Sequence, residues 1–168
     1  MSVRFFISTV VSVMLLSACG AWQAVSDTSA GAYRAVFHKQ VKVLAVDLSA
    51  REALNQDAAG RATSVAVRVY QLKDRKRFDG ASYEELLRND RKMLDLEASM
   101  AYVLNPGASA SLSQPMQADT QYVAIVAFYR HPSDDWKYII EKKKLDADKP
   151  LKLELVNQSL LGPSDGVQ

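Results

Sequence analysis

The side chains that most often carry chemistry in proteins are few in this sequence and widely spaced. The chain has 168 residues, with 2 histidines and 1 cysteine. His38 and His131 lie 93 positions apart, and a metal or catalytic role needs ligands that converge on one site. Asp134 and Asp135 follow a proline-serine turn, where neighbouring side chains usually point apart. We therefore expect no catalytic residue, no metal and no cofactor, and we predict that the chain is not an enzyme.

The composition predicts a folded domain and argues against several classes of partner. Hydrophobic residues make up 48% of the chain and charged residues 24%, which suits a packed core and not a disordered chain. The formal net charge is only +2, and the basic triplets at 75–77 and 142–144 are not interleaved with aromatic residues. A nucleic-acid groove usually shows both features. We therefore expect no nucleic-acid partner and, without a catalytic group, no small-molecule substrate.

The first eighteen residues have the pattern of a secretory signal. Arg4 precedes an uncharged, apolar stretch from Phe5 to Ala18, which suits a signal sequence and is shorter than the ~20 residues of a permanent membrane span. Residues 16–19, Leu-Ser-Ala-Cys, resemble the lipobox of bacterial lipoproteins. That resemblance implies that residues 1–18 are a signal peptide removed by cleavage, and that Cys19 then carries covalent lipid.

The lipoprotein class also implies a location. Gly20 follows the cysteine, whereas the class generally uses Asp at that position for retention in the inner membrane. The absence of Asp implies the periplasmic face of the outer membrane. Several acyl chains make a lasting anchor, because each buried methylene contributes about 0.8 kcal/mol. We interpret residues 19–35 as a lipidated tether between this anchor and the folded domain.

The rest of the chain alternates with the period of two that is typical of β-strands. The pattern predicts strands from Val41 and over 63–72, 122–129, 136–141 and 151–156, and an Asn-Pro-Gly turn predicts a hairpin between 101 and 112. Ser82 and Glu85 form a capping box that predicts one helix, with a break near Asn89.

Many short strands favour a mainly β fold. We predict a two-sheet β-sandwich at residues 36–157, with a short helical insertion after the second strand. Glycine and proline near the end of the chain predict that residues 158–168 are a flexible C-terminal tail.

A loop and the strand after it carry a family signature. Residues 54–61, Leu-Asn-Gln-Asp-Ala-Ala-Gly-Arg, and 65–72, Val-Ala-Val-Arg-Val-Tyr-Gln-Leu, are similar to the signature of the TssJ family, outer-membrane lipoproteins of the bacterial type VI secretion system. Further matching features follow in the same order: Phe78, Leu86, Pro106-Gly107, the alternation at 122–130 and Trp136. The resemblance covers the chain from Cys19 to about Val156.

This resemblance implies a transthyretin-like sandwich of two four-stranded sheets without enzymatic activity. It implies a structural role in which the lipoprotein binds the periplasmic domain of the inner-membrane protein TssM, is linked indirectly to TssL, and anchors the complex to outer-membrane lipid. In the family, the loop between the first two strands contacts TssM, and by position this is 50–62 here. The implied contact residues are Leu54, Asn55, Gln56, Asp57, Gly60 and Arg61.

The chemistry of the loop fits a docking role. It is longer than a hairpin loop, Leu54 offers an apolar anchor among polar residues, and Gly60 permits a positive φ. A surface loop shaped only by solubility remains the alternative. Arg68, Tyr70 and Gln71 also match the signature, but they lie within a strand, so we expect them to organise packing.

Two other functions remain open. An outer-membrane lipoprotein that binds a glycan or another small ligand would use a cleft lined by Trp136, Tyr138 and Tyr129. A periplasmic hydrolase would pair His131 with a serine. Aromatic rings gathered on the surface would favour the first function, and a serine or carboxylate within hydrogen-bond reach of His131 would favour the second.

Overall fold

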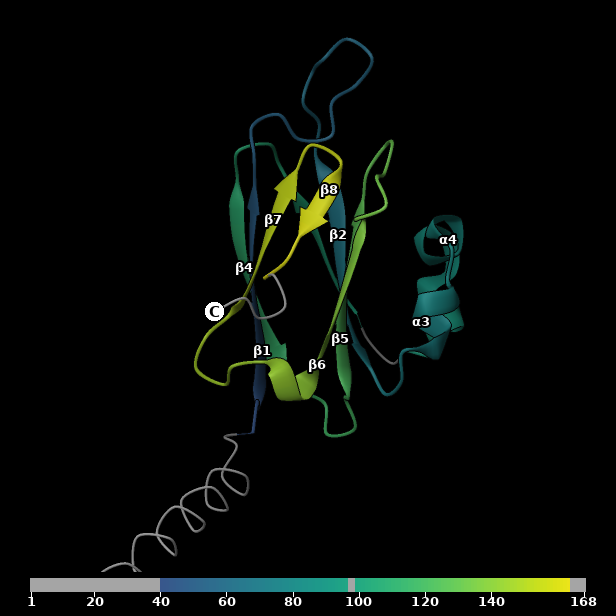
Figure 1. Ribbon diagram of the computed structural model, residues 1–168, viewed down its shortest axis with the longest axis vertical. Coiled ribbons are helices and arrows are strands. Elements are labelled where there is room, and N and C mark those ends of the chain that lie inside the picture. The colour runs from purple at the N-terminus through teal and green to yellow at the C-terminus, as the bar shows by residue number, and fades with distance from the viewer. Residues whose placement is uncertain (1–39, 97–98, 164–168) are drawn as a thin grey trace, which may run out of the picture. The chain divides into compact units, whose positions relative to one another are not determined.

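Alternating apolar residues fold into eight strands in two four-stranded sheets, which confirms the predicted mainly β sandwich (Figure 1). The computed structural model describes residues 40–96 and 99–163. The strands are β1 (Val43–Ala50), β2 (Val65–Leu72), β3 (Met100–Leu104), β4 (Ser109–Pro115), β5 (Tyr122–Phe128), β6 (Lys137–Glu141), β7 (Leu151–Val156) and β8 (Ser159–Leu161). The helices are α3 (Lys76–Gly80), α4 (Tyr83–Leu94) and the 3-10 helix η1 (Lys142–Lys144).

The two sheets pack face to face around the main core. Their strand orders are β4-β1-β7-β8 and β3-β2-β5-β6, and all pairs are antiparallel except β1 with β7. Every second residue of a strand points inward, so Val46, Val67, Ile125 and Leu155 are fully buried between the sheets. Removing these apolar side chains from water is the main driving force that holds the sheets together.

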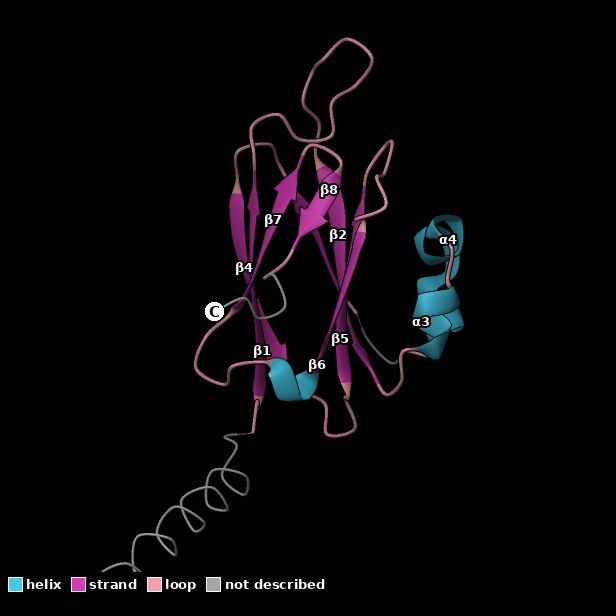
Figure 2. Cartoon of the chain, viewed as in Figure 1, coloured by secondary structure: helices cyan, strands magenta, loops and turns pink. Residues whose placement is uncertain are grey.

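Helices α3 and α4 lie beside the outer face of the β3-β2-β5-β6 sheet (Figure 2). They form a second apolar cluster with that sheet, in which Phe78 and Leu86 pack with Tyr70, Ala124 and Val126. Strand β5 is therefore buried on both faces, as its continuous apolar sequence predicts.

The start and the break of α4 are those predicted from the sequence. The Ser82 hydroxyl accepts a hydrogen bond from the Glu85 N–H, and the Glu85 carboxylate accepts one from the Ser82 N–H at 2.9 Å. Asn89 interrupts the helix with φ −141°. The capping box satisfies N–H groups that the first helical turn leaves without partners.

The predicted hairpin between residues 101 and 112 is wrong. Strand β3 pairs with β2 in one sheet, whereas β4 pairs with β1 in the other, so the turn after Leu104 carries the chain across the sandwich. Gly107 sits in this turn with φ +71°. The turn residues dictate that the chain reverses, but the strands that β3 and β4 join depend on contacts with distant parts of the sequence.

The predicted flexible tail at 158–168 is wrong for residues 159–161, which form β8. Asn157, with φ +51°, starts a tight turn, and β8 then returns antiparallel to β7, with Leu160 opposite Leu155. Leu160 is buried in the main core, which explains why this segment is held. Residues 164–168, the predicted signal peptide, the tether, Cys19 and His38 lie outside the described residues. No helix among the described residues is long and apolar enough to cross a membrane.

Candidate docking site

The loop between β1 and β2 projects from one end of the sandwich (Figure 1). It comprises residues 51–64, and its base is bound to both neighbouring elements of the sheet. The Ala50 N–H donates to the Ala108 carbonyl at 2.9 Å, and the Arg51 N–H donates to the Leu155 carbonyl at 3.0 Å. The loop therefore leaves the sheet from a fixed position.

Leu54 does not face solvent, contrary to its predicted role as an exposed anchor. Its side chain is fully buried and belongs to the main core. Its carbonyl accepts a hydrogen bond from the Thr63 N–H at 3.0 Å, which closes the base of the loop. Burial of the Leu54 side chain in the core removes its apolar surface from water and so stabilises the fold. Leu54 therefore holds the loop in position.

Asn55 is also an internal residue rather than a contact residue, with only 6% of its surface exposed. It adopts φ +47°, in the left-handed region that Asn tolerates better than most residues. Its Nδ2 donates to Thr63 Oγ1 at 2.9 Å and to the Ser64 carbonyl at 3.1 Å. Its Oδ1 accepts from the Arg130 N–H at 2.8 Å, and its own N–H donates to the Asn157 carbonyl at 2.8 Å.

Asn55 therefore joins three segments of the chain: the loop, the β5–β6 connection and the β7–β8 turn. The carboxamide has both donors and an acceptor, so it satisfies buried backbone groups of opposite kinds at once. Leaving such groups unpaired would be costly, which explains an amide at this position. The sequence signal that could have revealed this role is an Asn between an apolar residue and a polar loop.

The tip of the loop is closed by Asp57 and Arg61. Asp57 Oδ1 accepts hydrogen bonds from the N–H groups of Ala59 and Arg61, both at 2.9 Å, and the Asp57 N–H donates to the Arg61 carbonyl at 2.9 Å. Asp57 Oδ2 lies 2.8 Å from Arg61 Nη2. Gly60 has φ +74°, in agreement with the positive φ predicted for it. The tip is thus shaped before any partner arrives.

The electrostatics of the tip favour an ionised carboxylate. The backbone and side-chain hydrogen bonds from Arg61 hold the pKa of Asp57 below its usual range, and Arg130 acts in the same direction. Asp57 therefore remains charged at neutral pH and keeps the Arg61 side chain beside it.

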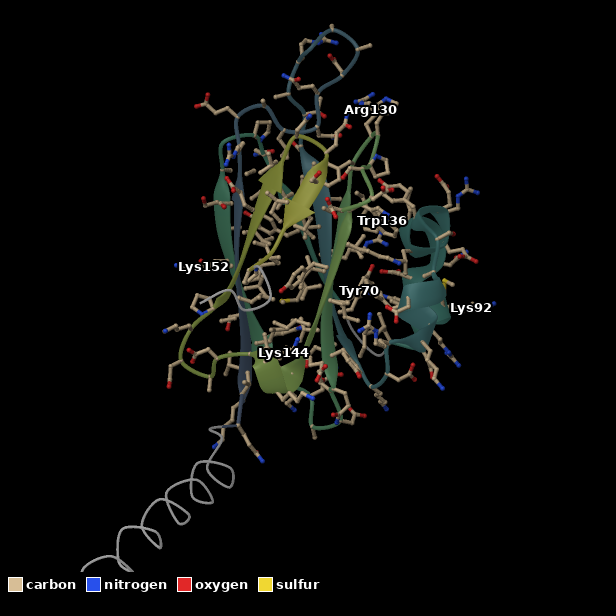
Figure 3. The ribbon with its side chains drawn as sticks, in the orientation of Figure 1. Tyr70, Lys92, Arg130, Trp136, Lys144 and Lys152 are labelled. Atoms are coloured by element: carbon tan, nitrogen blue, oxygen red, sulfur yellow. The ribbon has the colours of Figure 1, made fainter. Side chains whose placement is uncertain are left out.

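The residues that the tip presents to solvent are Gln56, Ala58, Ala59, Gly60 and Arg61. Arg130 and His131 are exposed in the neighbouring β5–β6 connection, which the Asn55 hydrogen bond joins to the loop (Figure 3). The sequence predicted neither Arg130 nor Asn157 as part of this site, because both enter it from distant segments. Of the predicted contact residues, Gln56, Gly60 and Arg61 face outward, Asp57 shapes the tip, and Leu54 and Asn55 face inward.

The signature strand β2 organises packing, as expected. Arg68 Nη1 donates to the Leu86 carbonyl at 2.8 Å and lies 3.1 Å from Asp90 Oδ2, and the Tyr70 hydroxyl donates to the same carboxylate at 3.0 Å. These contacts fix α4 on the sheet. Burial and the Asp90 charge raise the pKa of Tyr70, so the hydroxyl stays a donor.

Gln71 ties the β4–β5 connection to the other end of β2. Its Nε2 donates to the Pro115 carbonyl at 2.9 Å, and its Oε1 accepts from the Gln117 N–H at 2.8 Å and from Thr120 Oγ1 at 2.9 Å. Gln71 is 6% exposed and Thr120 1% exposed, so the bond between these two side chains is shielded from water, and the other two bonds are partly buried. They link the two sheets through a polar network.

The aromatic residues proposed for a ligand cleft do not gather on the surface. Tyr129 is buried in the main core, where its hydroxyl donates to the Ser159 carbonyl at 2.7 Å. Trp136 packs edge-to-face on Tyr83, with ring centroids 5.0 Å apart. Tyr138 lines a groove beside β7 that neither of the other two rings reaches. Packing therefore accounts for these side chains.

The groups proposed for hydrolysis are not assembled either. His131 is exposed and makes no hydrogen bond or ion pair with the described residues. Ser133 Oγ bonds instead to the Gln158 carbonyl at 3.0 Å and to Ser159 Oγ at 2.8 Å. Over the described ranges, 40–96 and 99–163, no cluster of His, Cys, Asp or Glu could hold a metal ion.

The fold and the site together define a two-sheet β-sandwich protein with a preorganised loop at one end. The family model for "Type VI secretion lipoprotein, VasD, EvfM, TssJ, VC_A0113" matches residues 42–158. The chain therefore belongs to the type VI secretion lipoprotein family, which confirms the TssJ resemblance. No curated protein sequence matches the chain significantly.

Solved structures show the same fold. A chain of a type VI membrane complex is 33% identical with a TM-score of 0.70, and the match covers 74% of this chain and 100% of that one. A chain in the structure of the T6SS protein TssM C-terminal domain from EAEC is 31% identical with a TM-score of 0.68, over 74% of this chain and 99% of that one. The lipoprotein TssJ1 from Pseudomonas aeruginosa, at 23% identity and a TM-score of 0.61, covers 76% of this chain and 98% of its own length, and shows the likeness of the fold alone.

Proposed function

We propose that this protein is a structural lipoprotein that anchors the type VI secretion membrane complex to the outer membrane by binding the periplasmic domain of TssM. The loop 51–64 is the docking element, and Gln56, Gly60 and Arg61 supply its contact surface. The observation that carries the proposal is the buried Asn55 hub, which holds a solvent-exposed tip in one shape. A loop that is already ordered loses little conformational entropy on binding.

The comparisons support this partner. Chains from a type VI membrane complex and from a TssM C-terminal domain structure match over nearly their whole lengths at 33% and 31% identity. Through TssM the lipoprotein is connected indirectly to TssL. The role requires no catalysis and no cofactor, and mechanical coupling between two membranes needs only a lasting anchor and a specific interface.

The anchor is the lipid on Cys19, inserted on the periplasmic side of the outer membrane. The lipobox and the Gly after the cysteine support this placement. Replacement of Cys19 with Ser is expected to leave the sandwich folded but to release it from the membrane and abolish secretion. Membrane fractionation on a density gradient, together with labelling by a radioactive fatty acid, measures both steps. A Cys19→Ser protein that is soluble in the periplasm and still supports secretion would contradict the anchoring role.

The docking role is tested by calorimetric titration of residues 20–168 with the periplasmic portion of TssM from the same organism. One variant replaces residues 56–61 with a Gly/Ser segment of equal length and keeps Leu54 and Asn55, because these two hold the fold. We expect saturable binding by the wild type and at least a tenfold weaker affinity for the variant.

A matched control alters the same protein away from the loop. Arg88, Arg91 and Lys92 are exposed on α4, and their replacement with Ala is expected to leave the affinity unchanged. Circular dichroism and thermal unfolding verify that both variants are folded. Equal affinity of the loop variant and the wild type would exclude the loop as the docking element.

A further inference from the structure

The end of the sandwich opposite the docking loop is rich in lysine. The helix η1 (Lys142–Lys144) lies there, and Lys42 immediately precedes β1 at the same end (Figure 1). The Met116 N–H donates to the Lys42 carbonyl at 2.9 Å, and Lys142 Nζ donates to the Gln117 carbonyl at 3.4 Å. The turn after β4 therefore joins Lys42 to η1. We call this region, with its neighbours listed below, the basic end.

The carboxylates of the basic end do not cancel its positive charge. Its cations are Lys42, Lys73, Arg75, Lys76, Arg77, Lys142, Lys143, Lys144 and Lys149, and its acids are Asp74, Asp79, Asp95, Asp119, Glu141, Asp146 and Asp148. Nine cations against seven acids leave a net charge of +2. Lys42, Lys143 and Lys144 are exposed to solvent, and Lys143 also pairs with Glu141 at 2.6 Å.

The docking end carries the opposite sign. Its charged side chains are Arg51, Arg61, Arg130, Glu52, Asp57, Asp134, Asp135 and Glu154, which gives a net charge of −2. Figure 3 shows Arg130 at this end and Lys144 at the other. A charge difference along the sandwich means that a charged surface would attract one end and repel the other.

The path of the chain indicates that the charged surface nearest the basic end is a membrane. The chain enters the sandwich at Lys42, 23 positions after Cys19, a length that reaches at most about 80 Å. A lipid on Cys19 therefore confines the domain to this distance from the membrane, raises the effective concentration of headgroups around it, and attaches the tether at the basic end. At this effective concentration, weak contacts between lysines and headgroup phosphates are enough to hold the basic end against the membrane.

We propose that the basic end lies against the anionic phospholipid headgroups of the membrane that holds the Cys19 lipid. This inference rests on the proposed lipid anchor and deepens it. The ammonium groups of Lys42, Lys143 and Lys144 contact headgroup phosphates, and the acidic docking end is repelled. The sandwich therefore stands with the loop 51–64 directed away from the membrane, where a partner that spans the periplasm can reach it.

Vesicle binding tests the contribution of the charges separately from the lipid. The non-lipidated chain, residues 19–168 with Cys19→Ser, is sedimented with vesicles of phosphatidylcholine alone or mixed with phosphatidylglycerol, at low and at high salt. We expect binding only to the phosphatidylglycerol vesicles, and loss of that binding at high salt because the headgroup charge is screened. Binding that ignores phosphatidylglycerol or salt would overturn the proposal.

Matched variants locate the contact. The triple change Lys42→Ala, Lys143→Ala and Lys144→Ala is expected to weaken vesicle binding at least tenfold, since each lysine near an anionic surface contributes about fivefold. The control Arg88→Ala, Arg91→Ala and Lys92→Ala removes the same charge from α4, which bears Lys92 in Figure 3, and is expected to change binding less than twofold. Equal losses in both variants would show a response to net charge alone and overturn the proposal.

Orientation is measured on the lipidated protein in the same vesicles. A fluorophore placed by Lys144→Cys is expected to be quenched by a headgroup quencher, whereas one placed by Gln56→Cys is not. Equal quenching at both positions would contradict the upright orientation. Affinity of the Lys42/Lys143/Lys144 variant for TssM in solution reports on the proposed function alone, so failure of either proposal is recognised separately.

Discussion

Asn55 Oδ1 accepts a hydrogen bond of 2.8 Å from the backbone N–H of Arg130, a residue 75 positions further along the chain. This bond joins the β1–β2 loop to the β5–β6 connection, and so makes a continuous surface from two segments that the sequence separates. It also explains why a buried polar residue stands where the signature loop begins. The same side-chain amide also donates to the Thr63 hydroxyl and the Ser64 carbonyl within the loop. A substitution of Asn55 would therefore remove hydrogen bonds from several segments at once.

We expect Asn55→Ala to lower the free energy of unfolding by about 2–3 kcal/mol, because several buried backbone and hydroxyl groups lose their partner. Urea denaturation measures the change. Hydrogen exchange of the Arg130 amide should accelerate, since that N–H loses its acceptor. Gln56→Ala is the neighbouring control: its side chain is exposed, so the stability should change by less than about 0.5 kcal/mol. Equal stability of both variants would contradict the role of Asn55.

The shape of the tip should depend on the ionisation of Asp57. Its pKa is below the usual range in the folded chain, so the carboxylate stabilises the tip above its ordinary pKa of about 3.9, and this contribution is lost as the pH falls through the lower, folded pKa. No change is expected between pH 8 and pH 5.

An NMR titration of the Ala59 and Arg61 amides checks this prediction, because both donate to Asp57 Oδ1. Their shifts should titrate only below about pH 4. In Asp57→Asn the same amides keep a side-chain oxygen to bind, and the acid titration should disappear. A midpoint between pH 5 and pH 7 would show that another group controls the tip.

Gln71→Leu should destabilise the protein by about 2–4 kcal/mol, because the Gln117 N–H, the Thr120 hydroxyl and the Pro115 carbonyl all lose a shielded partner. Thr120→Val removes only one of the three bonds, and should cost about 1 kcal/mol. Chemical denaturation of both single variants and of the double variant measures the difference. The double variant should be less destabilised than the two single effects predict, because they share one hydrogen bond. Full additivity would argue against a common network.

The β8 strand should be sensitive to Gly162. A Cβ at this position would lie 2.2 Å from Tyr138 Cε2, so Gly162→Ala forces the aromatic ring or the strand to move. Overpacking of this kind typically costs about 1–3 kcal/mol. Gly80→Ala is the matched control, since no atom lies within 4 Å of its added Cβ. Thermal unfolding should show a lower Tm for Gly162→Ala only, and an unchanged Tm in both would show that β8 accommodates the methyl group.

Much of this architecture is predictable from local patterns. The period of two identifies β2, β5 and β7 within a few residues, because alternation reflects the two faces of each strand. The capping box of Ser82 and Glu85 and the positive φ of Gly60 are also local, since they depend on neighbours three or four positions away or on one residue's own sterics. The position of the candidate docking loop follows from the strands on either side.

Other features are decided only by the tertiary structure. The turn at Gly107 predicts a reversal, but whether β4 joins β3 or β1 depends on which sheet offers a free edge and an apolar face. In the sequence, Leu54 and Asn55 have the appearance of exposed loop residues. In the structure, Leu54 is buried in the core, and Asn55 is hydrogen-bonded to Arg130 and Asn157. Strand β8 forms because Leu160 finds space in the core beside β7. The residue types determine what each segment can do, and long-range burial and hydrogen bonding determine which of those possibilities is realised.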